Sequence, residues 1–167
     1  MLTTYDYPSA LLADEAGIEI LLVGDSLGMV VLGYSNPVPV TVDDVIHHTK
    51  PVSRATKRAL VVADMPFMSY RISREQALRN AAHLIQEGGA DAVKIEGGKK
   101  IAPLVREIVD AGIPVQAHIG LMPQRASVGD SFKAQGKDAV TAEMILADAQ
   151  ALEKAGAFSV VLEFVTA

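Results

Sequence analysis

The sequence predicts an α/β fold built on a parallel sheet, and three observations support this. Short apolar runs recur along the 167 residues, amphipathic stretches separate them, and most of the runs do not alternate strictly between polar and apolar residues. Such runs, rich in Val, Ile and Leu, are typical of parallel strands that are covered on both faces. Repeated βα units imply right-handed crossovers and leave two architectures open, a doubly wound sheet and a barrel. No G-x-G-x-x-G follows the first strand, which weighs against a dinucleotide-binding fold.

Six strands and five helices are predicted from these patterns. The strands are residues 2–5, 20–23, 59–63, 92–95, 114–117 and 159–162, and the helices are 9–16, 42–57, 73–87, 99–110 and 141–155. Glycines follow four of the helices, where helices commonly end. Ser73 and Gln76 fit a capping box. Pro51 lies inside the second helix and is predicted to kink or break it, because proline removes a backbone hydrogen bond.

Composition narrows the class of protein. There are no cysteines, so disulfides and thiolate metal sites are excluded. No apolar run reaches the length of about 18 residues needed for a transmembrane helix, and no secretory signal is visible at the N-terminus. The net charge is -5, the basic residues are scattered and aromatic residues are few. We therefore expect a cytoplasmic protein that binds neither nucleic acid nor membrane.

Polar and ionisable side chains follow most of the predicted strands. They are Asp25 with Ser26, Asp64, Lys94 with Glu96, His118, and Glu163. A charge at the end of a buried strand is costly unless it is paired, hydrogen-bonded or bound to a metal. Ligand sites of parallel α/β folds lie at the carboxyl ends of the strands, so we expect these side chains to converge on one pocket.

The carboxylates in this set indicate a magnesium site. Asp25, Asp64 and Glu96 offer only oxygen ligands, which favours Mg²⁺ over zinc. Lys94 could neutralise the carboxylate of a substrate. Glu163 could act as a base, because burial raises the pKa of a carboxyl group towards neutrality.

Each of these residues also has a purely structural interpretation. Asp25 and Asp64 could be helix N-caps, Lys94 and Glu96 could pair with each other, and His118 could be a satisfied core histidine. The remaining histidines are predicted to lie on helices and to be non-catalytic; they are His47, His48 and His83.

Six segments, in order along the chain, resemble signatures of the ketopantoate hydroxymethyltransferase (3-methyl-2-oxobutanoate hydroxymethyltransferase) family. They are residues 23–29 (VGDSLGM), 39–43 (PVTVD), 63–70 (ADMPFMSY), 93–98 (VKIEGG), 118–124 (HIGLMPQ) and 162–163 (LE). The resemblance covers essentially the whole chain. It implies a (β/α)₈ TIM barrel of the phosphoenolpyruvate mutase/isocitrate lyase type. It also implies transfer of a hydroxymethyl group from 5,10-methylenetetrahydrofolate to 3-methyl-2-oxobutanoate, giving 2-dehydropantoate for pantothenate biosynthesis through a Mg²⁺-stabilised enolate.

The resemblance also implies a role for each matching residue. Glu163 falls on the catalytic base. The metal-binding positions fall on Asp25, Asp64 and Glu96, and the substrate-binding positions fall on Asp25, Ser26, Asp64, Lys94 and His118. It further implies a homo-oligomer, which is a decamer in the family.

The chain departs from the family pattern chiefly in length. A (β/α)₈ barrel typically needs about 250 residues, so the resemblance implies a single incomplete barrel domain over residues 1–167, with about six βα units. The two open edges of such a sheet would invite association. Gly129–Phe132 stands where the family has a Gly-Gly pair before an aromatic residue, and Thr166 stands where it has proline.

Three alternative functions remain. A related barrel lyase that acts on another 2-oxo acid is disfavoured by the specific motifs at the strand ends. An incomplete barrel could be an inactive truncated subunit of this enzyme. Gly24-Asp-Ser-Leu27 also spells the motif of a GDSL-type serine hydrolase, and Asp44 and His47 form a D-x-x-H sequence. In that hydrolase family the Asp and His lie near the C-terminus, which argues against this alternative.

Overall fold

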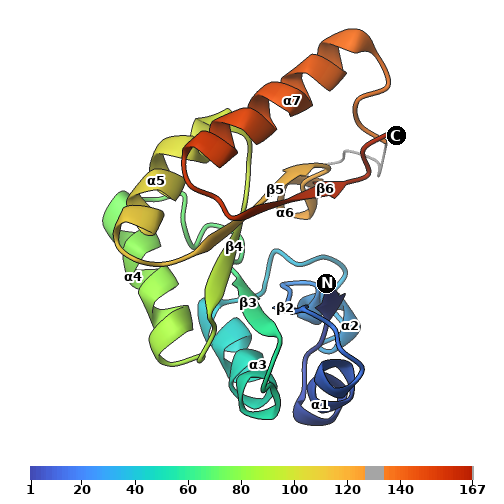
Figure 1. The fold of residues 1–167 in the computed structure, drawn as a ribbon, viewed down its shortest axis with the longest axis vertical. Coiled ribbons are helices and arrows are strands. Elements are labelled where there is room, and N and C mark those ends of the chain that lie inside the picture. The colour runs from blue at the N-terminus through green and yellow to red at the C-terminus, as the bar shows by residue number, and fades with distance from the viewer. Residues whose placement is uncertain (127–133, 167) are drawn as a thin grey trace. The chain divides into compact units, whose positions relative to one another are not determined.

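The computed structural model describes residues 1–126 and 134–166. The chain divides into two compact units, Met1–Val93 and Lys94–Ala167. The order of strands in the sheet is β1-β2-β3-β4-β5-β6. Figure 1 traces the chain from one terminus to the other and labels its helices and most of its strands. Gly129–Phe132, where a departure from the family pattern was noted, lies outside the described residues.

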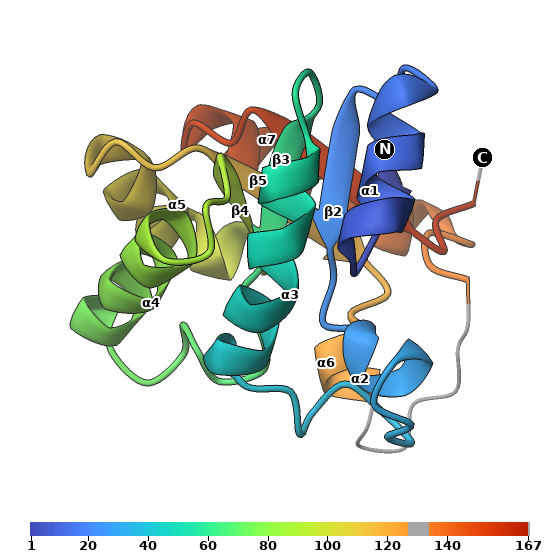
Figure 2. The ribbon, with the colours of Figure 1, turned by 90° about the horizontal axis from the view of Figure 1, so that it is seen from below.

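The first unit alternates strands and helices. Its elements are β1 (Leu2–Thr3), α1 (Tyr7–Glu15), β2 (Ile20–Val23), α2 (Leu27–Val30), α3 (Val42–Ala55), β3 (Leu60–Asp64) and α4 (Arg74–Gln86). β1 pairs in parallel with β2, and β2 pairs in parallel with β3. α1 packs beside α3, and α3 packs against β2 and β3, as Figure 2 shows. The register places Leu22 opposite Val62, and both join Ala92 in a buried apolar cluster.

The second unit begins inside β4 (Ala92–Glu96). Its other elements are η1 (Lys99–Ile101), α5 (Ala102–Asp110), β5 (Val115–Gly120), α6 (Pro123–Ala126), α7 (Ala139–Lys154) and β6 (Ser159–Glu163). β5 pairs in parallel with β6, and α7 packs against both of these strands and against α5. The fully buried Val105 and Ile108 of α5 and Leu152 of α7 supply apolar contacts of this unit.

The predicted strands are confirmed, but their burial differs along the sheet. β2, β3, β4 and β5 are almost entirely buried, as expected of parallel strands with both faces covered. The expectation is wrong for β1, whose two residues are exposed, and for β6, which is only partly buried. Both lie at the ends of the strand order, where a strand has a neighbour on one side only.

Helix α3 runs through Pro51 without a break. Pro51 was predicted to kink or break this segment, and the break is wrong, since the helix is continuous from Val42 to Ala55. The kink stays a prediction. Two features stabilise it. Thr41 and Asp44 form a capping box at its start, and the buried side chains of Val45 and Val52 pack it into the unit. Their contribution offsets the one backbone hydrogen bond that proline cannot make.

The predicted capping box at α4 is only half present. Ser73 accepts a hydrogen bond from the backbone N–H of Gln76, so it is the N-cap. The return bond is missing, because Gln76 Oε1 makes no hydrogen bond to any described residue. Two short helices, α2 and α6, were not predicted, since four residues are too few to show helical periodicity. Within the described part of the chain, no helix has the length and apolar character to span a membrane.

Thr41→Ala should lower the free energy of unfolding by about 1 kcal/mol, because it removes the side chain that caps α3. The Thr41 hydroxyl accepts from the backbone N–H of Asp44 and donates to the Asp44 carboxylate at 2.7 Å. Urea unfolding followed by circular dichroism measures the change. Thr3→Ala, at an exposed strand position, is the matched control and should change the midpoint much less. Equal midpoints for both variants would contradict this role of the cap.

Candidate active site

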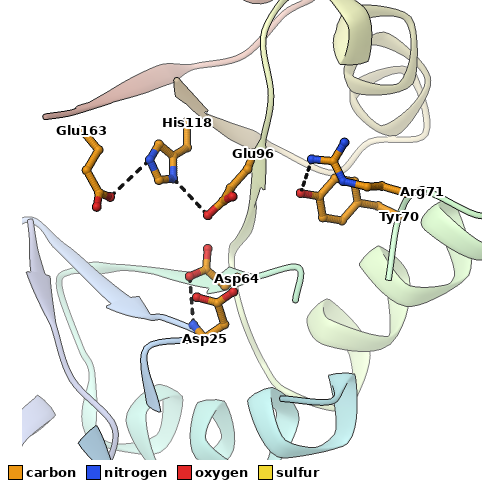
Figure 3. A network of polar contacts seen from close by, with 7 residues as sticks. All are labelled: Asp25, Asp64, Tyr70, Arg71, Glu96, His118 and Glu163. Atoms are coloured by element: carbon orange, nitrogen blue, oxygen red, sulfur yellow. Dashed lines mark hydrogen bonds and ion pairs between the residues drawn. The ribbon is translucent and has the colours of Figure 1, made fainter. Parts of the chain in front are cut away.

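Asp25 and Asp64 meet at the carboxyl ends of two neighbouring strands. The parallel register pairs Val23 with Ala63, so the residues that follow lie side by side. The backbone N–H of Asp25 donates to Asp64 Oδ2 at 3.0 Å, and the two residues are only 6% and 3% exposed (Figure 3). Gly24 allows this close approach, since a Cβ there would lie 3.3 Å from Asp64 Oδ2 and 2.7 Å from Ser26 Oγ.

Ser26 is held by a tyrosine that the sequence analysis assigned to a strand. The hydroxyls of Tyr5 and Ser26 are 2.9 Å apart. The backbone carbonyl of Tyr5 in turn accepts a hydrogen bond from His48 Nδ1 of α3, at 2.8 Å. Ser26 is the N-cap residue of α2 but makes no side-chain capping bond. Its hydroxyl is therefore engaged with Tyr5 and not with the helix.

In the second unit, His118 stands between two carboxylates. His118 Nδ1 lies 3.5 Å from Glu96 Oε1, and Nε2 lies 3.2 Å from Glu163 Oε2 (Figure 3). These are ion-pair contacts that fall short of hydrogen-bond geometry. An imidazolium ring could offer an N–H to each carboxylate, whereas a neutral ring could offer only one. The side chains of His118 and Glu96 are almost fully buried, and that of Glu163 is 34% exposed.

The pKa of Glu163 is lowered, not raised as the sequence analysis expected. The polar contact with the His118 ring is the largest cause, and the charges of His118 and Lys94 act in the same direction. Partial burial raises the pKa but is outweighed. The expectation was wrong because it considered desolvation and not the cationic neighbours. Glu163 is therefore ionised at neutral pH and reachable from solvent.

Each unit thus assembles part of the predicted site. Asp25, Ser26 and Asp64 lie together in the first unit, and Glu96, His118 and Glu163 lie together in the second. Lys94 lies on β4, is 5% exposed and acts on Glu163 through its charge. That Asp25, Asp64 and Glu96 share one ion stays a prediction.

In the first unit, the residues that could hold a metal ion are the neighbouring carboxylates Asp25 and Asp64. Among residues 1–126 and 134–166, no group of three or more His, Cys, Asp or Glu side chains is arranged to hold a metal ion. Mg²⁺ commonly uses only one or two protein carboxylates and keeps water or substrate oxygens at its other positions. Two adjacent, buried carboxylates fit that requirement.

Neither Asp25 nor Asp64 is the N-cap of a helix. Ser26 occupies that position before α2, and Asp64 is the last residue of β3. His118 lies within β5, which continues to Gly120 and not only to residue 117 as predicted. His47 is exposed on α3, and His83 forms an exposed ion pair with Glu87 at 3.1 Å.

The serine hydrolase alternative lacks its supporting geometry. The carboxylate of Asp44 accepts hydrogen bonds from the backbone and the hydroxyl of Thr41, so it caps α3. The Ser26 hydroxyl contacts Tyr5. Nothing in these contacts links Ser26 to Asp44 and His47 as a nucleophile, acid and base would require.

Three site residues were missed by the sequence analysis. Tyr5 was counted in the first strand, although β1 ends at Thr3 and leaves Tyr5 just beyond its carboxyl end. The strand-end rule that found the other residues would have found it with the correct boundary. His48 was predicted to lie on a helix and to be non-catalytic; it does lie on α3, and its contact with the Tyr5 carbonyl was not foreseen. Gly120 carries no chemical signal, yet a Cβ there would lie 2.3 Å from the Glu163 carbonyl oxygen.

A family model described as ketopantoate hydroxymethyltransferase matches residues 1–167, the whole chain. The chain belongs to this family. The 3-methyl-2-oxobutanoate hydroxymethyltransferase of Heliobacterium modesticaldum is 60% identical over all 167 residues. The match covers 60% of the length of that relative, so the chain spans well under two thirds of it.

Solved structures show the fold to which this family member belongs. 2,3-Dimethylmalate lyase, a member of the PEP mutase/isocitrate lyase superfamily, aligns with a TM-score of 0.71 at 20% identity, covering 99% of this chain and 56% of that one. Phosphonopyruvate hydrolase in complex with oxalate and Mg²⁺ aligns with a TM-score of 0.71 at 12% identity, covering 97% and 56%. The fold is therefore the β/α barrel type of these solved structures, with six strands in the part of the chain that the structure describes.

Proposed function

We propose that this chain carries the hydroxymethyltransferase chemistry of its family. The reaction transfers a one-carbon unit from 5,10-methylenetetrahydrofolate to 3-methyl-2-oxobutanoate and gives 2-dehydropantoate. The proposal rests mainly on the exposure of Glu163, which is an ionised carboxylate at the end of a strand and is partly exposed. The other three carboxylates, Asp25, Asp64 and Glu96, are buried. A base must be reachable by its substrate, and Glu163 meets this condition.

The roles of the residues follow from their charge and burial. Glu163 takes the proton from C3 of the 2-oxo acid, and the carbanion that forms attacks the methylene carbon as its bond to one folate nitrogen breaks. Water then displaces the second folate nitrogen, which supplies the hydroxyl oxygen of the product and releases tetrahydrofolate. Lys94 offsets negative charge on the substrate carboxylate, and the Ser26 hydroxyl donates to it. His118, between Glu96 and Glu163, orients the base and contacts the substrate.

Mg²⁺ is the proposed cofactor, with Asp25 and Asp64 as ligands and Glu96 as the third carboxylate. When bound, it would supply Lewis-acid stabilisation of negative charge on the 2-oxo acid. The donor set supports this choice, because it contains only carboxylates and the chain has no cysteine. Phosphonopyruvate hydrolase, which shares the fold, was solved with oxalate and Mg²⁺, and oxalate resembles the planar oxo-acid group of the proposed substrate.

The proposed setting of this activity is that implied by the family. The chain would work in the cytoplasm as part of a homo-oligomer, up to a decamer, with one incomplete barrel domain per chain. The alternative is an inactive subunit of this enzyme.

Exchange of the C3 proton separates these alternatives. The chain is incubated in D₂O with 3-methyl-2-oxobutanoate, with and without Mg²⁺, and the C3 proton signal is followed by NMR. We expect a loss of this signal that depends on both the chain and Mg²⁺. A rate equal to that of buffer with Mg²⁺ would overturn the proposal for this chain and support the inactive subunit. Formation of 2-dehydropantoate after addition of the folate tests the second half-reaction.

Asp64→Asn should weaken Mg²⁺ binding at least about tenfold, because it removes one of two adjacent carboxylate charges. Asparagine has nearly the same shape and can still accept the hydrogen bond from the N–H of Asp25. Titration calorimetry with Mg²⁺ measures the affinity. Asp110→Asn, at an exposed position, is the control and should bind Mg²⁺ like the original chain. Unchanged affinity in Asp64→Asn would remove Asp64 from the ligand set.

A further inference from the structure

Three residues of the first unit, His48, Tyr5 and Ser26, are joined in series by two hydrogen bonds. Tyr5 links a helix surface to a residue of the candidate site, through its backbone carbonyl on one side and its hydroxyl on the other. We propose that Tyr5 is a positioning residue that fixes and polarises the Ser26 hydroxyl for a 2-oxo acid carboxylate. This inference rests on the proposed function.

The backbone of Tyr5 is fixed on both sides along the chain. The residue before it, Thr4, donates its N–H to the carbonyl of Leu22 at 3.0 Å, which ties it to β2. The residue after it, Asp6, caps α1 by accepting from the N–H of Ser9 at 2.9 Å. Tyr5 therefore has little freedom to move its side chain away by a backbone shift.

His48 adds a third constraint. The Tyr5 carbonyl can only accept, so the proton of this 2.8 Å contact belongs to His48 Nδ1. The contact holds the backbone of Tyr5 to α3.

The Ser26 hydroxyl lies near the Asp64 carboxylate. The ideal Cβ position of Gly24 is 2.7 Å from Ser26 Oγ and 3.3 Å from Asp64 Oδ2, so the two oxygens lie close to one another. If Tyr5 donates its phenolic proton to Ser26 Oγ, the serine proton is left to be donated onward. Hydrogen bonds in series strengthen one another, so the serine becomes a better donor to an anionic oxygen.

A double-mutant cycle tests the coupling of the two hydroxyls. The affinity of the chain for 3-methyl-2-oxobutanoate is measured by calorimetry at saturating Mg²⁺, for the original chain, Tyr5→Phe, Ser26→Ala and the double variant. We expect each single change to weaken binding about fivefold. We expect the double variant to bind no more weakly than Ser26→Ala alone, because Tyr5 acts through Ser26.

Tyr7→Phe is the matched control, since it removes a hydroxyl from an exposed tyrosine two residues away; it should leave the affinity unchanged. Urea midpoints of all variants show whether a change in affinity follows a loss of folded chain. Unchanged affinity in Tyr5→Phe would overturn the proposed role of Tyr5, and so would effects that multiply in the double variant. Neither result would overturn the proposed function. If the original chain does not bind the oxo acid, the proposed function fails, and this inference with it.

Discussion

Glu163→Gln should reduce exchange of the C3 proton by about 10²–10⁴-fold, which is the range that a positioned general base contributes. Glutamine keeps the shape of the side chain but cannot accept a proton at neutral pH. Mg²⁺ binding should be retained, because Glu163 is not among the proposed ligands. NMR in D₂O measures the exchange, and titration calorimetry measures the metal affinity.

Glu153→Gln is the matched control for this change, since Glu153 is an exposed residue of α7. It should exchange the C3 proton like the original chain. Retained exchange in Glu163→Gln would remove Glu163 from the role of base. Loss of both exchange and Mg²⁺ affinity would place Glu163 in the metal site instead.

The pH dependence of this exchange follows from the lowered pKa of Glu163. The carboxylate is the active form, so kcat/KM should be fully retained above the ordinary glutamate pKa of 4.5 and should fall only as the pH drops through the lowered value. The same contact stabilises the folded chain above the ordinary pKa, and that stabilisation is lost in the same acidic window. An acid limb above 4.5 would show that burial outweighs the His118 contact.

The sequence was sufficient to place most of the candidate residues at the ends of strands, because the rule that finds strand ends is local. An apolar run followed by a charge marks a strand end, and Asp64, Glu96 and Glu163 are indeed the last residues of their strands. The interior strands could also be predicted from local sequence, and the predicted bounds of β2 are the observed ones. What depends only on neighbouring residues could be predicted.

Features that depend on tertiary contacts could not be predicted from the sequence. The direction of the Glu163 pKa shift depends on His118, which lies on a different strand, and the sequence does not show which side chain faces which. The Tyr5 contact depends on where β1 ends and on the path of the chain after β2. Pro51 is tolerated because capping and packing of α3 compensate for the missing hydrogen bond, which a local propensity does not include.

Adding a single methyl group at Gly120 should strongly destabilise the second unit. It lies at the end of β5 with φ +90°, opposite Glu163 in the β5–β6 register. A Cβ there would lie 2.3 Å from the Glu163 carbonyl oxygen, which also accepts a hydrogen bond from the N–H of Leu121 at 2.9 Å. A backbone atom cannot rotate away as a side chain can, so the ends of β5 and β6 must separate.

Gly120→Ala should therefore lower the free energy of unfolding by about 2–4 kcal/mol, combining left-handed backbone strain with a lost hydrogen bond. It should also slow C3 exchange by about 10²-fold, since a shift of about 1 Å in a catalytic group has that effect. Gly112→Ala is the matched control. Its φ of +91° imposes the same strain, but nothing lies within 4 Å of the added Cβ.

The difference between these two variants isolates the contact of Gly120 with Glu163. Urea unfolding gives the stability of each, and exchange in D₂O gives the rate. The strain common to both should cost each variant about 1–2 kcal/mol, and only Gly120→Ala should lose exchange while still folded. Equal stability and equal exchange in the two variants would mean that β6 can move without displacing the base, and that Gly120 serves only to turn the chain. A selective loss of exchange shows instead that the position of Glu163 is determined by how closely two strand ends approach, which only glycine permits at this point.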